Sequence, residues 1–379
     1  MRNLFRWAIG LSLLNAAGAA AATFSVIATV PAGPQIGAVR NGLLYGTIPA
    51  SGAGVLFSLK TNGRSFTLLH TFAAGTDGSA PNARLVIDKT GNLFGTTTGG
   101  GTNGEGTLWE YSAAGVMSAP HVFGGSGDGG TPMQGPTLGG YDTIYGTASM
   151  GANGNSGNIY KLLPDGTYVD LYKFTSSADG HCPFSGVAFA SGATLYGTVV
   201  GAGYGGNPNG SVWKFTVKHG LETLYIFRDG SDGEWPDQAP ALDTVGNLYG
   251  TTHVRSGSQF AGAIWKIDTQ GRFSVLRDLD GATDGYSANS PLVHGKDGKL
   301  YGTTLAGGVN GFGTIYSVTP SGGFSVVHMF ANTGDRQSGP RRAWQHLWRH
   351  GQRSSIQNRA VAILALVPRL CCMSEHSAG

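Results

Sequence analysis

An Asp-Gly pair recurs along the chain at a nearly constant interval, and its carboxylates are the most regular groups that could do chemistry. The copies begin at Asp77, Asp128, Asp179, Asp232 and Asp284, and the first four read Asp-Gly-x-x-Pro. A ring of carboxylate oxygens would suit a hard cation such as calcium. One aspartate per copy is sparse for calcium, however, and the carboxylate of an Asp-Gly turn caps nearby backbone amides. The spacing therefore favours a structural role, with metal or ligand contact as the alternative.

Aromatic residues in nearby loops are the second group of candidates for ligand contact. Tyr204, Trp235 and Phe312 could stack on sugars or anchor a partner, as could Phe260 and Tyr286. The alternative, which we favour, is that these rings cover neighbouring loops. The predicted ligand-binding set is therefore the five aspartates with Trp235, Tyr204 and Phe312, and the metal ligands stay unassigned.

The sequence assigns no catalytic residue. Its ten histidines form no cluster with metal-ligand spacing. One slot of a recurring β-favouring run holds histidine, tyrosine or arginine, an exchange that indicates packing. The residues in this slot are His70, His121, Tyr172, Tyr225, Arg277 and His328. The residues that break the repeat are His181, Glu234, His253 and Arg255, and they stand in different copies. Cys182 is interpreted as a small buried residue.

The elements that must position these residues repeat about every 51 residues. The marker is the triplet Tyr-Gly-Thr, with phenylalanine for tyrosine once. Its copies begin at Tyr45, Phe94, Tyr145, Tyr196, Tyr249 and Tyr301. A period of this length is typical of repeat architectures, in which each unit buries its faces against its neighbours.

Each unit reads as four short strands separated by Gly, Asn, Asp and Pro turns. In the last complete copy these strands are 290–293, 300–304 and 314–318, with the preceding run at 273–279. The third strand carries an aromatic column: Phe57, Trp109, Tyr160, Trp213, Trp265 and Tyr316. Strands that are apolar on both faces are covered on both faces. We therefore expect an all-β propeller of six or seven four-stranded blades.

The glycine of the triplet predicts a close approach of backbone, where neighbouring blades meet. The Asp-Gly loops and the glycine-rich loops must emerge on one face of the ring, which is our candidate functional face. The segment 24–30 matches the Phe-Ser-Val strand, so we expect it to complete the last blade or to begin an unfinished seventh.

The N-terminus predicts export. Arg2 and Arg6 precede an apolar run that ends in small residues, so we assign 1–22 as a cleaved signal peptide, 23–335 as the propeller and 336–379 as a basic tail. No later segment suits a membrane span. The net charge of +3 is small and lies largely in the tail, which excludes a nucleic-acid surface. We expect an extracellular, cell-surface or periplasmic monomer.

The repeat stops after Asp335, where Arg336 replaces the expected glycine. If the gene is read one base later, the tryptophan codons of Trp344 and Trp348 become glycine codons. The two glycines would then stand four residues apart, as Gly91 and Gly95 do in an intact repeat. We hypothesise that 336–379 is a frameshifted seventh repeat, with a genuine basic tail as the alternative. A genomic sequence without a Tyr-Gly-Thr repeat in the +1 frame would contradict the frameshift.

The chain resembles the GloVer (Gloeo_Verruco) tandem-repeat family of exported bacterial proteins over about residues 24–335. Residues 246–252 (Gly-Asn-Leu-Tyr-Gly-Thr-Thr) and 307–316 carry the resemblance best. It implies a surface or secreted protein and supplies no catalytic residues or cofactor. We therefore expect a non-enzymatic scaffold that binds an extracellular glycan, protein or small ligand. The alternative is an extracellular propeller enzyme, a polysaccharide lyase or hydrolase.

Overall fold

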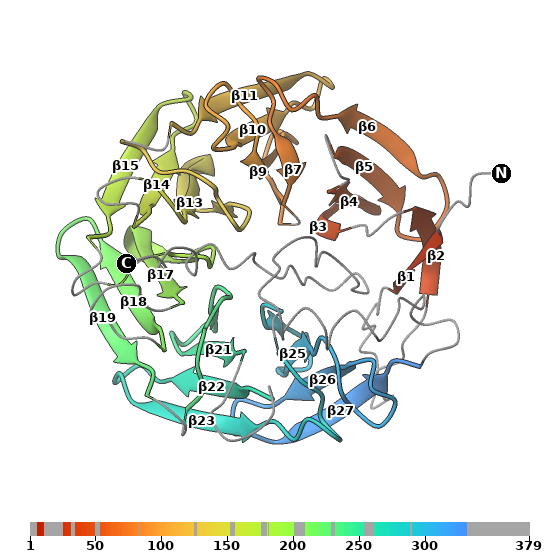
Figure 1. Ribbon diagram of the computed structural model, residues 1–379, viewed down its shortest axis with the longest axis vertical. Helices are drawn as coiled ribbons and strands as arrows, with labels where there is room; N and C mark the ends of the chain where they lie inside the picture. The colour runs from red at the N-terminus through yellow and green to blue at the C-terminus, as the bar shows by residue number, and fades with distance from the viewer. Residues whose placement is uncertain are drawn as a thin grey trace, which may run out of the picture.

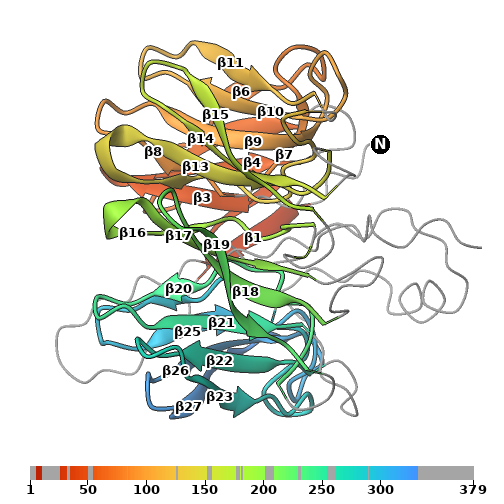
Figure 2. The ribbon, with the colours of Figure 1, turned by 90° about the vertical axis from the view of Figure 1, so that its left-hand side faces the viewer.

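Each repeat folds into one antiparallel sheet, with four strands in five blades and a divided first strand in blade 2, and the six sheets follow one another around a ring, which confirms the predicted propeller. This computed structural model describes residues 6–10, 26–31, 35–49, 54–82, 84–124, 127–151, 156–175, 180, 182–200, 209–228, 232–253, 261–288 and 290–331. Figure 2 shows the ring edge-on. Within the described residues, no helix is long and apolar enough to span a membrane.

The six blades take their strands in chain order. Blade 1 contains β3 (Gln35–Arg40), β4 (Leu43–Ile48), β5 (Val55–Lys60) and β6 (Thr67–Thr71). Blade 2 contains β7 (Ser79–Pro81) and β8 (Val86–Ile87), which both pair with β9 (Leu93–Gly99), then β10 (Thr107–Tyr111) and β11 (Met117–Val122). Blade 3 contains β12 (Thr137–Leu138), β13 (Ile144–Ala148), β14 (Asn158–Leu162) and β15 (Tyr168–Lys173).

The remaining blades repeat the same order. Blade 4 contains β16 (Ala188–Ala190), β17 (Thr194–Val199), β18 (Ser211–Thr216) and β19 (Gly220–Ile226). Blade 5 contains β20 (Ala241–Leu242), β21 (Leu248–Thr252), β22 (Ala263–Ile267) and β23 (Phe273–Asp278). Blade 6 contains β24 (Val293–His294), β25 (Leu300–Thr303), β26 (Thr314–Val318) and β27 (Phe324–Met329). Short 3-10 turns, η1 (Gly140–Asp142) and η3 (Ser191–Ala193), join the first two strands of blades 3 and 4.

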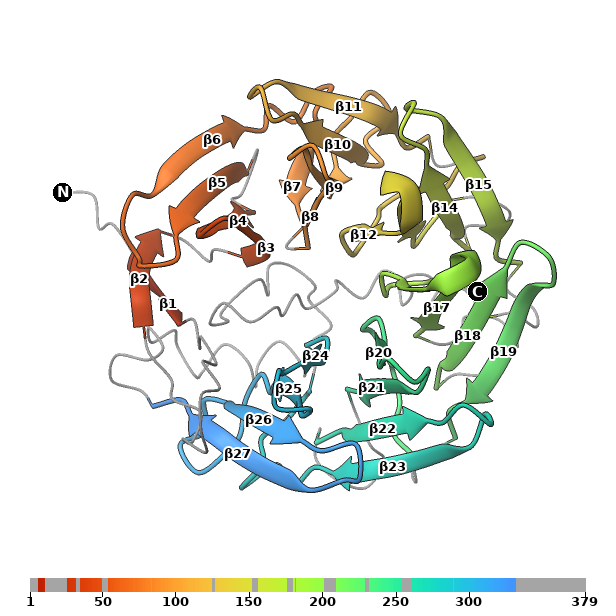
Figure 3. The same ribbon diagram turned by 180° about the vertical axis from the view of Figure 1, so that it is seen from behind.

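The first strand of each blade lies at the inner edge of the ring and the fourth at the outer edge (Figure 3). The Asp-Gly loop therefore connects the outer strand of one blade to the inner strand of the next, a point that the sequence leaves open. It lies against the glycine-rich loop of the blade that it enters, as the hydrogen bonds from Gly101 N to Gly75 O (2.7 Å) and from Tyr286 N to Ala306 O (2.6 Å) show. The prediction that both loops share a face is confirmed.

The N-terminal strand does not complete the last blade. Blade 6 draws all four strands from its own repeat, whereas β2 (Val26–Pro31) pairs with β1 (Arg6–Gly10). This two-stranded sheet lies between blades 6 and 1 (Figure 1). The cleaved signal peptide stays a prediction, and residues 332–379 lie outside the described residues.

The hydrophobic core lies between neighbouring blades. One cluster joins Val212 and Phe227 of blade 4 to Leu248, Trp265 and Ile267 of blade 5. The members of the aromatic column have no exposed surface, so the prediction that the strands are covered on both faces is confirmed.

The triplet glycine has a different cause from the one expected. Gly250 is paired with Trp265 on the adjacent strand, and a Cβ at Gly250 would lie 2.1 Å from the Trp265 ring. Gly95, Gly146, Gly197 and Gly302 face their own blade's column residue in the same way, whereas a Cβ at Gly46 would lie 2.2 Å from Gln35 O and 2.8 Å from the Phe57 ring. The close approach is therefore that of an aromatic side chain within the blade, not that of a neighbouring blade.

The triplet threonine links one blade to the next. Thr47 of blade 1 donates a hydrogen bond to Asn82 O in the loop that enters blade 2, at 2.9 Å. The corresponding bonds are from Thr96 to Gln134 O, from Thr147 to Ser185 O and from Thr198 to Pro236 O. Blades 1 to 4 are thus each linked to the next blade by the threonine that marks the period, whereas the buried Thr251 hydroxyl of blade 5 has no hydrogen-bond partner among the described residues.

Candidate functional site

The described aspartates of the Asp-Gly loops, which we call the crossover aspartates, each make two contacts with the blade that the loop leaves. Each described carboxylate accepts a hydrogen bond from the backbone amide four residues earlier, as in Gly124 N to Asp128 (2.9 Å) and Arg228 N to Asp232 (3.0 Å). The same contact joins Ala73 to Asp77 and Asp280 to Asp284. These bonds are the amide caps that an Asp-Gly turn predicts.

The second contact corrects our interpretation of the variable slot on the fourth strand. The slot residue lies seven positions before the aspartate and reaches its carboxylate: His70 Nε2 to Asp77 Oδ2 is 2.7 Å, and Arg277 Nη2 to Asp284 Oδ2 is also 2.7 Å. Tyr225 donates a hydrogen bond to Asp232. Histidine, tyrosine and arginine exchange there because each can donate a hydrogen bond, so packing alone was the wrong interpretation. Tyr172 and Asp179 share the seven-residue spacing, but Asp179 lies outside the described residues.

Two of the predicted aromatic contacts can be placed. Phe312 packs, with Val327, against the buried pair Ile315 and Phe330, so its ring covers core. Trp235 is partly buried and has a left-handed backbone (φ 57°). Ala80, Thr131, Cys182 and Ser287 have the same conformation at the same loop position. Tyr204 lies outside the described residues, and ligand contact by the predicted set stays a prediction. Cys182 is buried, as predicted.

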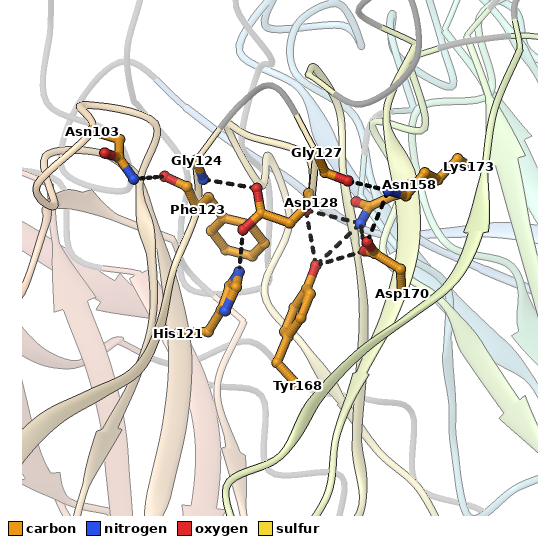
Figure 4. Close-up of polar contacts among 10 residues, drawn as sticks. All are labelled: Asn103, His121, Phe123, Gly124, Gly127, Asp128, Asn158, Tyr168, Asp170 and Lys173. Atoms are coloured by element: carbon orange, nitrogen blue, oxygen red, sulfur yellow. Dashed lines mark hydrogen bonds and ion pairs between the residues drawn. The ribbon is translucent and has the colours of Figure 1, made fainter.

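The repeat is broken most clearly between blades 2 and 3, where polar side chains of both blades meet (Figure 4). We call this group the blade 2–3 polar cluster. Its members are His121 and Asp128, which enter from the end of blade 2, and Asn158, Tyr168, Asp170 and Lys173 of blade 3.

Asp170 is the centre of the cluster. Its Oδ1 accepts hydrogen bonds from Asn158 Nδ2 (2.5 Å) and from the Tyr168 hydroxyl (3.3 Å), and its Oδ2 lies 3.2 Å from Lys173 Nζ. Tyr168 and Asn158 also donate to Asp128 O, both at 2.9 Å. The side chains of Asp170 and Lys173 keep 25% and 35% of their surface exposed, so this ion pair can be reached from solvent.

Burial governs the ionisation of the two rings in the cluster. Desolvation lowers the pKa of His121, and the neighbouring carboxylate of Asp128, with Nε2–Oδ2 at 2.9 Å, offsets this only in part. Burial also raises the pKa of the Tyr168 hydroxyl. Near neutral pH both rings are therefore uncharged, and Tyr168 acts as a hydrogen-bond donor.

Our sequence reasoning missed Asp170, Lys173 and Asn158. The signal was available, because Asp170 occupies the strand position that holds Leu68, Ala119, Thr223, Val275 and Val326 in the other blades. A carboxylate at a position that is otherwise apolar or small marks the one blade that departs from the pattern.

The four residues proposed from sequence as enzyme candidates are only partly placed, since His181 and Arg255 lie outside the described residues. Glu234 and His253 do meet, but through the backbone, with His253 N donating to Glu234 O at 3.0 Å. The His253 side chain instead lies 3.7 Å from the buried carboxylate of Asp237. Over the described ranges no group of three His, Cys, Asp or Glu residues is placed to hold a metal ion.

Comparison with known proteins identifies the repeat and the fold. A family model described as Gloeobacter/Verrucomicrobia repeat matches residues 22–207 and 191–347. No curated protein matches the chain.

Solved structures share the propeller fold at low identity. A protein from Lactobacillus plantarum has a TM-score of 0.51 at 13% identity, over 85% of this chain and 95% of that one. A candidate 6-phosphogluconolactonase from Bacteroides uniformis has a TM-score of 0.50 at 13% identity, over 88% and 98%. TolB from Acinetobacter baumannii has a TM-score of 0.45 at 14% identity over 76% of this chain, and this chain spans only 64% of that protein. These likenesses concern the fold alone.

Proposed function

Because the chain belongs to the Gloeobacter/Verrucomicrobia repeat family, we propose that its repeated blades serve as a non-catalytic binding scaffold that is exported to the cell surface or the medium. The observation that carries this proposal is the blade 2–3 polar cluster. There, one blade replaces an apolar or small position with Asp170 and adds Lys173 beside it, and both stay partly exposed. A solvent-accessible charge pair held by hydrogen bonds from two blades is suited to binding a polar ligand.

A binding role fits the cluster better than catalysis. The pairing of His121 with Asp128 resembles a base and its orienting carboxylate, but His70 and Asp77 make the same pairing one blade earlier. A contact that recurs with the repeat is explained by loop structure. The hydroxyl in the cluster belongs to Tyr168, and its raised pKa makes it a poor nucleophile.

The chemistry of the exposed pair favours a ligand that carries both donors and acceptors. Lys173 can donate and Asp170 can accept hydrogen bonds, and a sugar hydroxyl can do both. An extracellular glycan is therefore the first ligand class to test, with a protein or a small polar ligand as further candidates.

The test is a glycan-array screen of the full chain, followed by calorimetric titration of any glycan that binds. We expect Asp170→Val, which introduces the residue found at the same position in blades 5 and 6, to weaken binding at least tenfold. Glu222→Val on blade 4 is the matched control, since Glu222 and Lys214 form an exposed ion pair at 3.6 Å. Binding that is equal in both variants would remove the role given to the blade 2–3 polar cluster, and the absence of any bound glycan would remove the glycan as its ligand. Export is tested separately by sequencing the N-terminus of the mature protein.

A further inference from the structure

One position at the inner edge of the ring is glycine, alanine or proline in blades 3 to 6 and carries a longer side chain in blades 1 and 2. The residues that occupy it, ten positions before each Tyr-Gly-Thr triplet, are Gln35, Arg84, Gly135, Gly186, Ala239 and Pro291, each at or just before the first strand of its blade. The first strands surround the axis of the ring (Figure 3). Arg84 therefore places a cationic side chain at an inner-edge position where four of the six blades have glycine, alanine or proline and none of the other five has a charge.

The side chain of Arg84 extends from blade 2 toward blade 4. A Cβ added at Gly135 in blade 3 would lie 1.8 Å from Arg84 O, so glycine is required beneath the arginine. Arg84 Nη1 lies 3.4 Å from the position that a Cβ at Gly186 in blade 4 would take. Blade 3 thus packs against the backbone of Arg84, and blade 4 lies beside its guanidinium.

No described group neutralises this guanidinium. The ion pairs of the described residues do not include Arg84, and neither do their side-chain hydrogen bonds. Burial also lowers the pKa of the Arg84 guanidinium, with no acidic neighbour to offset the effect. A partly buried cation without a partner is unfavourable, so a repeat that retains glycine, alanine or proline at this position in blades 3 to 6 gains no stability from the exchange.

A ligand could approach from the adjoining cavity. An open cavity of about 580 Å³ lies between the first strands of blades 1, 2 and 3. Its lining includes Leu85, which follows Arg84 in the chain, but not Arg84 itself. The cavity lining also holds two cations, Arg40 and Lys89, and two carboxylates, Asp88 and Asp142, so its formal charges balance; Lys89 Nζ lies 3.6 Å from Asp142 Oδ2.

We propose that Arg84 anchors an anion-binding site at the axis of the ring, which takes the oxyanion group of a ligand: a carboxylate, a sulfate or a phosphate. The planar guanidinium binds such groups through two parallel hydrogen bonds. This inference rests on the proposed binding function and names a ligand class for it. A glycan that carries uronate or sulfate groups would suit both the blade 2–3 polar cluster and the Arg84 site.

The experiment measures the melting temperature of the full chain with added galacturonate, phosphate or sulfate, against galactose and sodium chloride at matched ionic strength. We expect at least one oxyanion to raise the melting temperature by about 1–3 °C more than its control. Arg84→Gly should lose this extra shift and melt no lower than the parent in plain buffer. Arg64→Ala, which removes an exposed arginine, should keep the shift. If the shift in melting temperature differs among galacturonate, phosphate and sulfate, the anion with the largest shift identifies the preferred group.

Two outcomes would overturn the inference: an equal anion shift in Arg84→Gly, or no oxyanion effect on the parent protein. If Arg84→Gly fails to fold, Arg84→Lys serves with an NMR titration of the arginine side-chain signals, in which the Arg84 signal must move with added anion in the parent. A glycan whose affinity is unchanged by Arg84→Gly removes this inference and leaves the scaffold. An anion effect that depends on Arg84, together with an empty glycan screen, removes only the glycan proposal.

Discussion

The imidazole of His121 lies face to face with the phenol of Tyr168, with ring centroids 3.5 Å apart and planes 4° apart. His121 ends blade 2 and Tyr168 begins the outer strand of blade 3. Tyr225 and Phe273 make the same contact between blades 4 and 5, at 3.7 Å and 4°. The residue that reaches the crossover aspartate therefore also covers the next blade, so one side chain holds both the loop and the blade interface.

Removing Arg277 should cost far more stability than removing Arg272. Arg277 donates to the largely buried Asp284 and lies 4.9 Å above the ring of Phe324, whereas the pairing of Arg272 with Asp268 involves a side chain that is 75% exposed. We expect Arg277→Ala to lower the free energy of unfolding by about 2–3 kcal/mol, because it leaves Asp284 without its partner. Arg272→Ala should cost less than about 1 kcal/mol. Urea unfolding measures both, and equal losses would contradict the role given to Arg277.

Adding one methyl group at the triplet glycine should destabilise the blade. Gly250→Ala places a Cβ against the ring of Trp265, which is fully buried and cannot move aside easily. We expect a loss of about 3 kcal/mol or failure to fold. Gly75→Ala is the control, since nothing lies within 4 Å of its added Cβ. Thermal melting of both variants decides the matter, and a Gly250→Ala protein as stable as the control would show that the column does not need this glycine.

Protonation of His121 should weaken the fold in acid. Burial lowers its pKa in the folded chain, so the unfolded chain takes up the proton first as the pH falls below about 6.5. The stability that His121 contributes is therefore present above that pH and is lost as the pH falls toward the lower folded pKa. His121→Gln should show a smaller fall in melting temperature between pH 7.5 and pH 5.5 than the parent protein. An unchanged difference would exclude His121 as a source of the pH dependence.

The fold could be predicted from the sequence because the repeat supplies each constraint six times. Gly250 and Trp265, for example, stand in slots that every copy fills in a similar way. The contacts between different repeat positions were harder to predict. Tyr225 lies on a strand and Asp232 in the loop that follows it, and only the fold determines that the loop turns back toward the strand. Asp170 and Arg84 were missed for the opposite reason. Each occurs in a single copy, and a search for regularity passes over the residues that depart from it.

Replacing a triplet threonine by valine should uncouple neighbouring blades without changing the shape of the side chain. Thr47 has no exposed surface and donates to Asn82 O in the loop entering blade 2. Thr47→Val leaves that carbonyl without its donor, which should cost about 1–3 kcal/mol. Thr67→Val on the exposed edge of blade 1 is the control and should be nearly neutral. Chemical denaturation compares them, and a neutral Thr47→Val would mean that the bond contributes nothing to stability.

The four threonine bonds all run in one direction, from a hydroxyl of one blade to a carbonyl of the next, and this gives the ring a polarity. Truncation from the carboxyl end would leave hydroxyl donors, which can rotate to meet water, on the new terminal blade. Truncation from the amino end would instead leave backbone carbonyls, which are fixed in their loops. Shortened chains should therefore tolerate the loss of late blades better than the loss of early ones.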